Sequence, residues 1–144
     1  MFRLGRQVES ALLAVKALNE ASGKDVPISD ICLNYGLSKN TLSKIMQSLS
    51  AHKLIESSQG TRGGYKLMQP LNETSFFELL DALGEIKNLK CREGDSCSLS
   101  ENCSISSPLI KWELNFENHL KNTFLDELLY EQASKTSLDL NRSL

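Results

Sequence analysis

The spacing of apolar residues in the first part of the chain predicts three helices. Apolar residues recur every three or four positions over residues 4–20, as on one face of an α-helix. A short second helix is expected over residues 28–36, and a third over residues 39–52 with Ser38 as its N-cap. On their own, the second and third helices fit either a helix-turn-helix or an ordinary helical hairpin.

Two short strands are expected to follow these helices. Residues 54–57 and 65–68 have the composition of strands, and residues 58–64 between them form a glycine-rich turn that carries Arg62. Three helices followed by a hairpin with a basic tip are the elements of a winged helix. We therefore expect a winged helix-turn-helix domain over residues 1–70, in a chain that is mainly α with a small β-wing.

The second part of the chain has the pattern of a fourth helix and a long fifth helix, on either side of a polar segment. The fourth helix is expected to have Thr74 or Ser75 as its cap. The fifth is expected to begin with Ser107 as N-cap and Pro108 in the first helical position, and to run to about Tyr130.

One face of the expected long helix is apolar and needs a partner to cover it. Its residues are spaced by three or four: Leu109, Trp112, Phe116, Leu120, Phe124 and Leu128. Symmetric dimerisation would cover this face and suits a reader of palindromic DNA, whereas packing on the chain's own domain is the alternative. Residues 71–131 are thus expected to hold the fourth helix, a cysteine-rich loop and a dimerisation helix, and residues 132–144 a flexible tail.

The net charge of −2 is unevenly distributed along the chain. Residues 1–70 hold nine Lys and Arg against five Asp and Glu, whereas residues 71–144 hold seven against thirteen. A positive winged helix favours a polyanion such as DNA, although charge without a fold is weak evidence. Because the chain shows neither a signal-peptide core nor a long apolar run, we expect a cytoplasmic protein with no membrane partner.

Polar side chains on the third helix and the hairpin tip are the candidate DNA contacts. They are Ser38, Lys39, Asn40, Thr41, Ser43 and Lys44 on the helix, and Arg62, Gly63, Gly64 and Tyr65 on the hairpin. The first turn of a reading helix meets base edges, while lysines and hydroxyls also bind phosphates. The glycines allow close approach to a phosphate backbone, and Arg62 suits a narrow minor groove. A solvated helix face is the alternative interpretation.

Three of the four cysteines lie in one polar segment, at Cys91, Cys97 and Cys103, with five residues in each gap. Such a segment has little apolar surface to bury, so a bound metal centre would hold it in place. Thiolates suit iron–sulfur clusters, zinc or copper(I), and in a reducing cytosol cysteines favour ligands or redox centres over structural disulfides. Cys32, inside the second helix, is expected to be a buried small hydrophobe.

Together, the winged helix, the Cys-x5-Cys-x5-Cys segment and the long C-terminal helix resemble the bacterial winged-helix iron–sulfur regulators, the IscR- and NsrR-like transcriptional repressors. The resemblance covers about residues 1–130 and includes Gly-Thr-Arg-Gly-Gly-Tyr at residues 60–65, which is similar to the glycine-rich wing of that family. It implies a homodimer with one iron–sulfur cluster per subunit. It also implies an affinity for double-stranded promoter DNA that depends on the cluster, with nitric oxide, redox or iron status as the signal.

The fourth ligand of such a cluster is open. One branch of the family uses a histidine three residues after the last cysteine, where this chain has Ser106. The other branch takes an aspartate from the first helix of the partner subunit, and the matching residue here is Glu9. The missing histidine favours a [4Fe-4S] over a [2Fe-2S] cluster, with Glu9 as the candidate ligand. His52 and His119 are expected at the surface or at an interface.

Two further classes of protein remain as alternatives. The first is a DNA-binding regulator without a cluster. In one form of it zinc would hold the cysteines together, although five-residue gaps exceed the spacing of about two to four between paired zinc ligands. A thiol switch, in which two of the cysteines oxidise to a disulfide, is the other form. An enzyme is disfavoured, because the sequence shows no nucleophile–base arrangement, nucleotide-binding loop or HExxH-type site.

Overall fold

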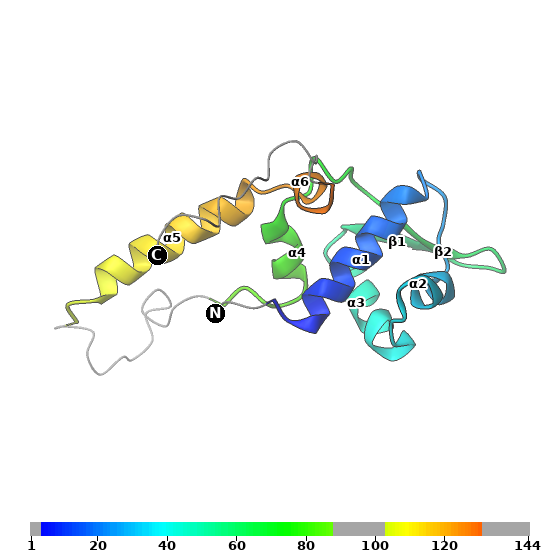
Figure 1. Ribbon diagram of the computed structural model, residues 1–144, viewed down its shortest axis with the longest axis horizontal. Helices are drawn as coiled ribbons and strands as arrows, with labels where there is room; N and C mark the ends of the chain where they lie inside the picture. Colours follow the sequence, from blue (N-terminus) through cyan, green and yellow to red (C-terminus); the bar gives the residue numbers. More distant parts are fainter. Residues whose placement is uncertain (1–3, 88–102, 131–144) are drawn as a thin grey trace, which may run out of the picture.

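The computed structural model describes residues 4–87 and 103–130, in which six helices and one hairpin follow one another along the chain (Figure 1). The elements are α1 (Arg6–Glu20), α2 (Ile28–Tyr35), α3 (Lys39–Ala51), β1 (Ile55–Ser58), β2 (Gly64–Leu67), α4 (Phe76–Ala82), α5 (Ser106–Lys121) and α6 (Leu125–Leu129). The predicted order of three helices and a hairpin is confirmed, and their ends lie within two residues of the predicted ones. The fold is mainly α with a small β-wing.

The helix-turn-helix forms because α2 stops abruptly and α3 starts again in a new direction. Gly36 ends α2 with φ +64°, a left-handed conformation that a residue without Cβ adopts easily, and its N–H donates to the Cys32 carbonyl oxygen. Apolar side chains of α1 and α3 then pack together in the core, among them Val15 and Leu18 from α1 and Leu49 from α3. This packing turns the polar side of α3 outward.

The hairpin is attached to the helices by a third extended segment. β1 and β2 pair antiparallel from Ile55 opposite Leu67 to Ser58 opposite Gly64. Val26, between α1 and α2, adds to the other edge of β2: its N–H donates to the Tyr65 carbonyl oxygen and its carbonyl accepts from the Tyr65 N–H, both at 2.9 Å. The wing is therefore fixed relative to the helix-turn-helix.

α4 begins with a capping box at Ser75, one of the two caps that the sequence predicted. The Ser75 hydroxyl accepts a hydrogen bond from the Glu78 N–H, and the Glu78 carboxylate accepts from the Ser75 N–H at 2.7 Å. Two backbone donors that a helix start leaves open are thereby satisfied.

The expectation of one long helix up to Tyr130 is wrong, because the structure has two helices there. α5 stops where polar side chains bond back to its last turn. The amide of Asn122 donates to the Asn118 carbonyl oxygen at 2.7 Å, and the hydroxyl of Thr123 donates to the His119 carbonyl oxygen at 2.8 Å. These side-chain bonds supplement the backbone bonds that the Asn122 N–H makes to the same two carbonyl oxygens at the end of the helix.

Pairing with a distant segment keeps the two helices apart. Phe124 is extended and forms an antiparallel bridge with Ser75. On one side of the bridge the Leu125 N–H donates to the Thr74 carbonyl oxygen at 2.9 Å. On the other side the Phe76 N–H donates to the Thr123 carbonyl oxygen at 2.7 Å. Because these backbone groups are bonded to the segment before α4, they are not available for a continuous helix.

The start of α5 also differs from the prediction. The helix begins at Ser106, so Ser107 is its second residue, not its N-cap, and Pro108 is its third. Proline is tolerated there because the N–H groups of a first turn have no acceptor within the helix.

One hydrophobic core joins the winged helix to the C-terminal elements. Leu71, Leu120 and Leu125 are buried in the same cluster as the apolar residues of α1 and α3. From this base α5 extends away from the rest of the molecule, at the left of Figure 1. Among residues 4–87 and 103–130, no helix is long and apolar enough to cross a membrane.

Candidate nucleic-acid interface

The first turn of α3 presents the polar surface that the sequence predicted. Ser38, Lys39, Asn40, Thr41 and Lys44 are exposed, and Ser43 is half-buried. The hydroxyl of Ser38, at the N-cap position, makes no hydrogen bond to the backbone of α3. These side chains are therefore free to meet a ligand, while the apolar side of the helix is buried in the core.

Of the four predicted wing residues, one is an exposed cation and three are wholly or partly buried. Arg62 at the hairpin tip is exposed, whereas Gly64 is buried and Gly63 and Tyr65 are half-buried. A Cβ on Gly63 would lie 2.4 Å from the Ser58 carbonyl oxygen, and a Cβ on Gly64 would lie 2.5 Å from the Val26 carbonyl carbon. Gly63 is thus required by the packing within the hairpin, and Gly64 by the packing of the hairpin against the segment before α2. The sequence pattern does not reveal either constraint.

Lys66 on β2 is a further cation near the wing, and it is engaged within the hairpin. Its ammonium group lies 2.9 Å from a carboxylate oxygen of Glu56 on β1. The hydrogen bond to this carboxylate and its charge raise the pKa of Lys66 above the usual value. Arg62, in contrast, has no ion pair with a described residue.

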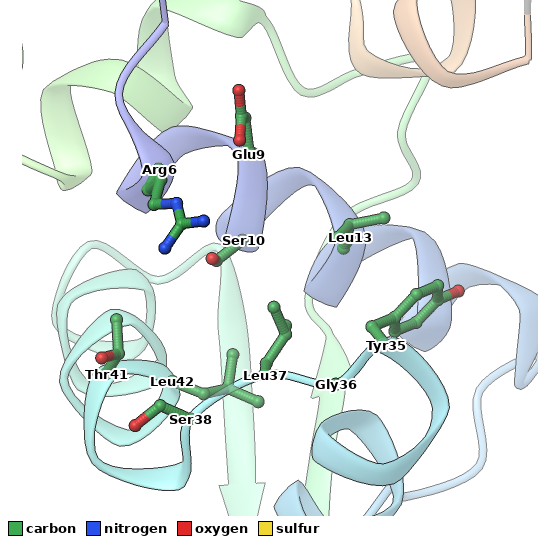
Figure 2. Close-up of a pocket in the computed structure, with 10 residues that line it drawn as sticks. All are labelled: Arg6, Glu9, Ser10, Leu13, Tyr35, Gly36, Leu37, Ser38, Thr41 and Leu42. Carbon is green, nitrogen blue, oxygen red and sulfur yellow. The ribbon is translucent and has the colours of Figure 1, made fainter.

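A cleft of about 440 Å³ lies between the start of α1 and the helix-turn-helix, beside the region where α1 and α3 pack together (Figure 2). Its lining comes from α1 on one side and from the turn and the start of α3 on the other: Arg6, Glu9, Ser10, Leu13, Tyr35, Gly36, Leu37, Ser38, Thr41 and Leu42. Figure 2 shows Arg6 extending from α1 toward the first turn of α3, while the carboxylate of Glu9 points away from α3. Arg6 was not among the predicted site residues, because only the tertiary fold brings it beside α3.

The described residues contain one of the three clustered cysteines. Cys103 precedes α5, is half-buried and is in no disulfide, whereas Cys91 and Cys97 lie outside the described residues. The hydroxyl of Ser106 donates to the carbonyl oxygen of Cys103 at 3.1 Å, which joins the cysteine to the first turn of α5. Within the described part of one chain, no three His, Cys, Asp or Glu residues gather as a metal site, and Glu9 and Cys103 are not brought together in one.

The remaining candidates lie as follows. Cys32 is half-buried and packs against the core, close to its expected environment. His52 and His119 are both exposed. His52 follows α3, with its Nδ1 atom 3.0 Å from the Ser48 carbonyl oxygen.

The predicted dimerisation stripe is shorter than expected. Leu109 and Trp112 on α5 are 40% and 64% exposed, Phe116 and Leu128 are also exposed, Phe124 is half-buried, and Leu120 is buried in the chain's own core. The rings of Trp112 and Phe116 stack with centroids 5.7 Å apart. The base of α5 packs against α4, which accounts for the burial of Leu120. The exposed part of the stripe on α5 therefore begins one turn further from the core.

Comparison with known proteins agrees with this arrangement. A family model named Rrf2 and described as an iron-dependent transcriptional regulator matches residues 4–131. The chain belongs to the Rrf2 family. Rrf2 proteins are DNA-binding transcriptional regulators, so the prediction of a DNA-binding regulator that is not an enzyme is confirmed.

Individual known proteins match most of the length of the chain. Protein aau3 of Rhizobium meliloti (strain 1021) is 28% identical over 131 residues, which cover 88% of this chain and 84% of that protein. The structure of CymR, the global cysteine regulator of B. subtilis, matches with a TM-score of 0.64 at 18% identity, over 90% of this chain and 97% of CymR. IscR of T. potens matches with a TM-score of 0.62 at 19% identity, over 90% and 88% of the two chains. At these identities the two structures show a common fold.

Proposed function

We propose that this Rrf2 protein is a homodimeric repressor in the cytoplasm, whose affinity for promoter DNA is set by an iron–sulfur cluster at Cys91, Cys97 and Cys103. The observation that carries the proposal is the position of Cys103, three residues before α5 and hydrogen-bonded to its first turn through Ser106. α5 bears exposed apolar side chains, Leu109 and Trp112 among them. A change at the cysteine is thereby passed to the helix that would join two subunits.

The DNA part of the proposal rests on α3 and the wing. The exposed side chains of the first turn of α3, Asn40 and Lys39 among them, would read base edges in the major groove, since amides and ammonium groups pair with purine edges there. Arg62 would enter the flanking minor groove. Two copies of α3 related by twofold symmetry would suit a palindromic operator with half-sites about 34 Å apart.

The donor set suits the proposed cluster. Thiolates are the usual ligands of iron–sulfur clusters, and a cluster held by three of them needs a fourth group. Glu9 is our candidate for that group, supplied across the dimer, because its exposed carboxylate points away from the helix-turn-helix in Figure 2. When bound, a [4Fe-4S] cluster would supply a centre whose state changes with nitric oxide, oxidants or iron. The chain would hold the cluster beside α5 with three cysteines, so that the fourth ligand is not a cysteine.

The test of the cluster is an anaerobic absorption spectrum with iron and sulfide analysis on freshly purified full-length protein. We expect brown protein with nearly equal iron and sulfide, and a ratio to protein that separates four irons from two. Promoter binding is then measured for the loaded and the cluster-free protein. Equal affinities of the two forms would contradict control by the cluster, and leave the DNA-binding fold intact.

A single substitution adds a sharper test of signal transmission. Cys97→Ala is expected to fold and dimerise like the wild type, and to bind DNA as the cluster-free protein does. The matched control is Cys32→Ala, which removes a cysteine packed against the core of the winged helix, outside the clustered set. A Cys97→Ala protein that still responds to nitric oxide would show that this thiol is not a ligand.

A thiol switch is the second candidate function, and one structural neighbour supports considering it. One of them is an oxidised form of CymR from Staphylococcus aureus, with a TM-score of 0.63 at 22% identity over 90% of this chain. In this candidate two of the clustered cysteines would form a reversible disulfide. Colourless protein that reconstitution cannot load, but that loses thiols reversibly, would support this switch over the cluster. Stoichiometric zinc in colourless protein would support a zinc staple.

A further inference from the structure

Arg6 lies beside the reading helix, although it is distant from it in sequence. It is the first residue of α1, and it lines the same cleft as Ser38 and Thr41. In Figure 2 its guanidinium group extends toward the first turn of α3. The side chain is exposed and lines the same cleft as Ser38 and Thr41, which are among the predicted base-reading residues.

The charge of Arg6 is not neutralised by any described residue. Three lysines, in contrast, are paired with carboxylates: Lys16 with Glu20, Lys66 with Glu56, and Lys121 with Glu117. Glu9 is the acidic residue in the first turn of α1, but it points away from Arg6 and from α3 (Figure 2). A guanidinium group offers five donors and holds its charge at every physiological pH, so an anion is its natural partner here.

The geometry of DNA identifies that anion. A helix about 10–12 Å across fills a major groove about 12 Å wide, which leaves a sugar–phosphate strand along each flank of the helix. In the view of Figure 1, the start of α1 and the hairpin tip lie on opposite sides of α3. Arg62 on the tip would cross one strand to reach the minor groove, and Arg6 is placed for the phosphates of the other strand.

We propose that Arg6 is a DNA-binding residue that contacts a backbone phosphate on the flank of α3 away from the wing. The proposal rests on the DNA binding proposed above and extends the interface to α1. Phosphate contacts fix the position of a protein on the duplex without reading its sequence. Arg6 would therefore raise affinity for all duplexes and set the docking angle of α3.

The test is the salt dependence of binding to a fluorescently labelled 30-base-pair duplex of mixed sequence, because a phosphate contact needs no operator. Full-length wild type and Arg6→Ala are titrated between 50 and 200 mM salt. Each phosphate contact contributes about 0.9 to the slope of log K against log salt, so the loss of two contacts from a dimer should lower the slope by about 1.8. We expect affinity at the middle of this range to fall about tenfold, and Arg6→Lys to retain most of it.

Lys111→Ala is the matched control, since it removes one exposed positive charge from α5, far from α3 in Figure 1. Its slope should equal that of the wild type, which separates a local contact from an effect of net charge. If Arg6→Ala melts differently by circular dichroism, Arg6→Gln replaces it as a neutral side chain of similar reach. Arg6 variants that bind with the wild-type slope would overturn this inference alone. A wild type that binds no duplex would instead overturn the proposed DNA binding.

Discussion

Gly64 offers a direct test of whether the wing glycines serve the DNA or the fold. The sequence pattern placed Gly64 among the DNA contacts, but the residue is buried against the segment that precedes α2. A Cβ at this position would lie 2.5 Å from the carbonyl carbon of Val26, 2.6 Å from its oxygen and 2.9 Å from the nitrogen of Pro27. All three neighbours are backbone atoms, so no side chain can rotate away to make room.

The cost of Gly64→Ala follows from the bonds that must break. Ordinary contact would require the Val26 segment to move outward by about 1 Å, which breaks both 2.9 Å hydrogen bonds between Val26 and Tyr65. At about 1 kcal/mol for each bond, the free energy of unfolding should fall by about 2 kcal/mol. The wing would also lose its attachment, so DNA affinity should fall although Arg62 is intact.

Urea unfolding followed by circular dichroism measures this loss. With a slope of about 2 kcal/mol per molar urea, the midpoint should shift down by about 1 M. Gly5→Ala is the control, because its Cβ would lie 3.9 Å from a Glu85 carboxylate oxygen, an ordinary contact. If Gly64→Ala unfolds at the same urea concentration as Gly5→Ala but binds DNA poorly, the packing argument is refuted and Gly64 is a DNA contact.

Three further predictions test other parts of the structure. Leu109→Glu should shift the protein from dimer to monomer in analytical ultracentrifugation. Leu114 is about equally exposed, at 41%, but lies on the opposite side of α5, so Leu114→Glu should leave the protein dimeric. Equal behaviour of the two variants would argue against dimerisation through the face that carries Leu109. Arg62→Ala should weaken DNA binding at least several-fold with an unchanged melting curve, and unchanged affinity would show that the wing is not used. Ser75→Ala should lower the free energy of unfolding by about 1 kcal/mol through loss of the capping box, as measured by urea unfolding.

Local signals in the sequence were sufficient for most of the elements. The periodicity of α1 and α3, the left-handed stop at Gly36 and the cap at Ser75 each act within a few residues. Such signals depend on backbone conformation and on hydrogen bonds between near neighbours. They placed the winged helix and the exposed side of α3 without knowledge of distant contacts.

The end of α5 shows where this reasoning fails. The apolar stripe continues through Leu120 and Phe124 to Leu128 and is compatible with one helix. The chain breaks instead, because Phe124 pairs with Ser75, a residue about fifty positions earlier. Periodicity cannot reveal a competing partner at that separation, and tertiary pairing overrides helix propensity.

The sequence by itself therefore determined the order of the helices and hairpin, the polar first turn of α3 and the cysteine spacing, because these depend on neighbours along the chain. Only the tertiary structure decided which apolar residues face the core, why Gly64 must be glycine, and that Arg6 lies beside α3. Each of these depends on atoms that are brought together from distant segments. Burial, close approach and an uncompensated charge are properties of the packed chain, and the sequence alone does not contain their distances.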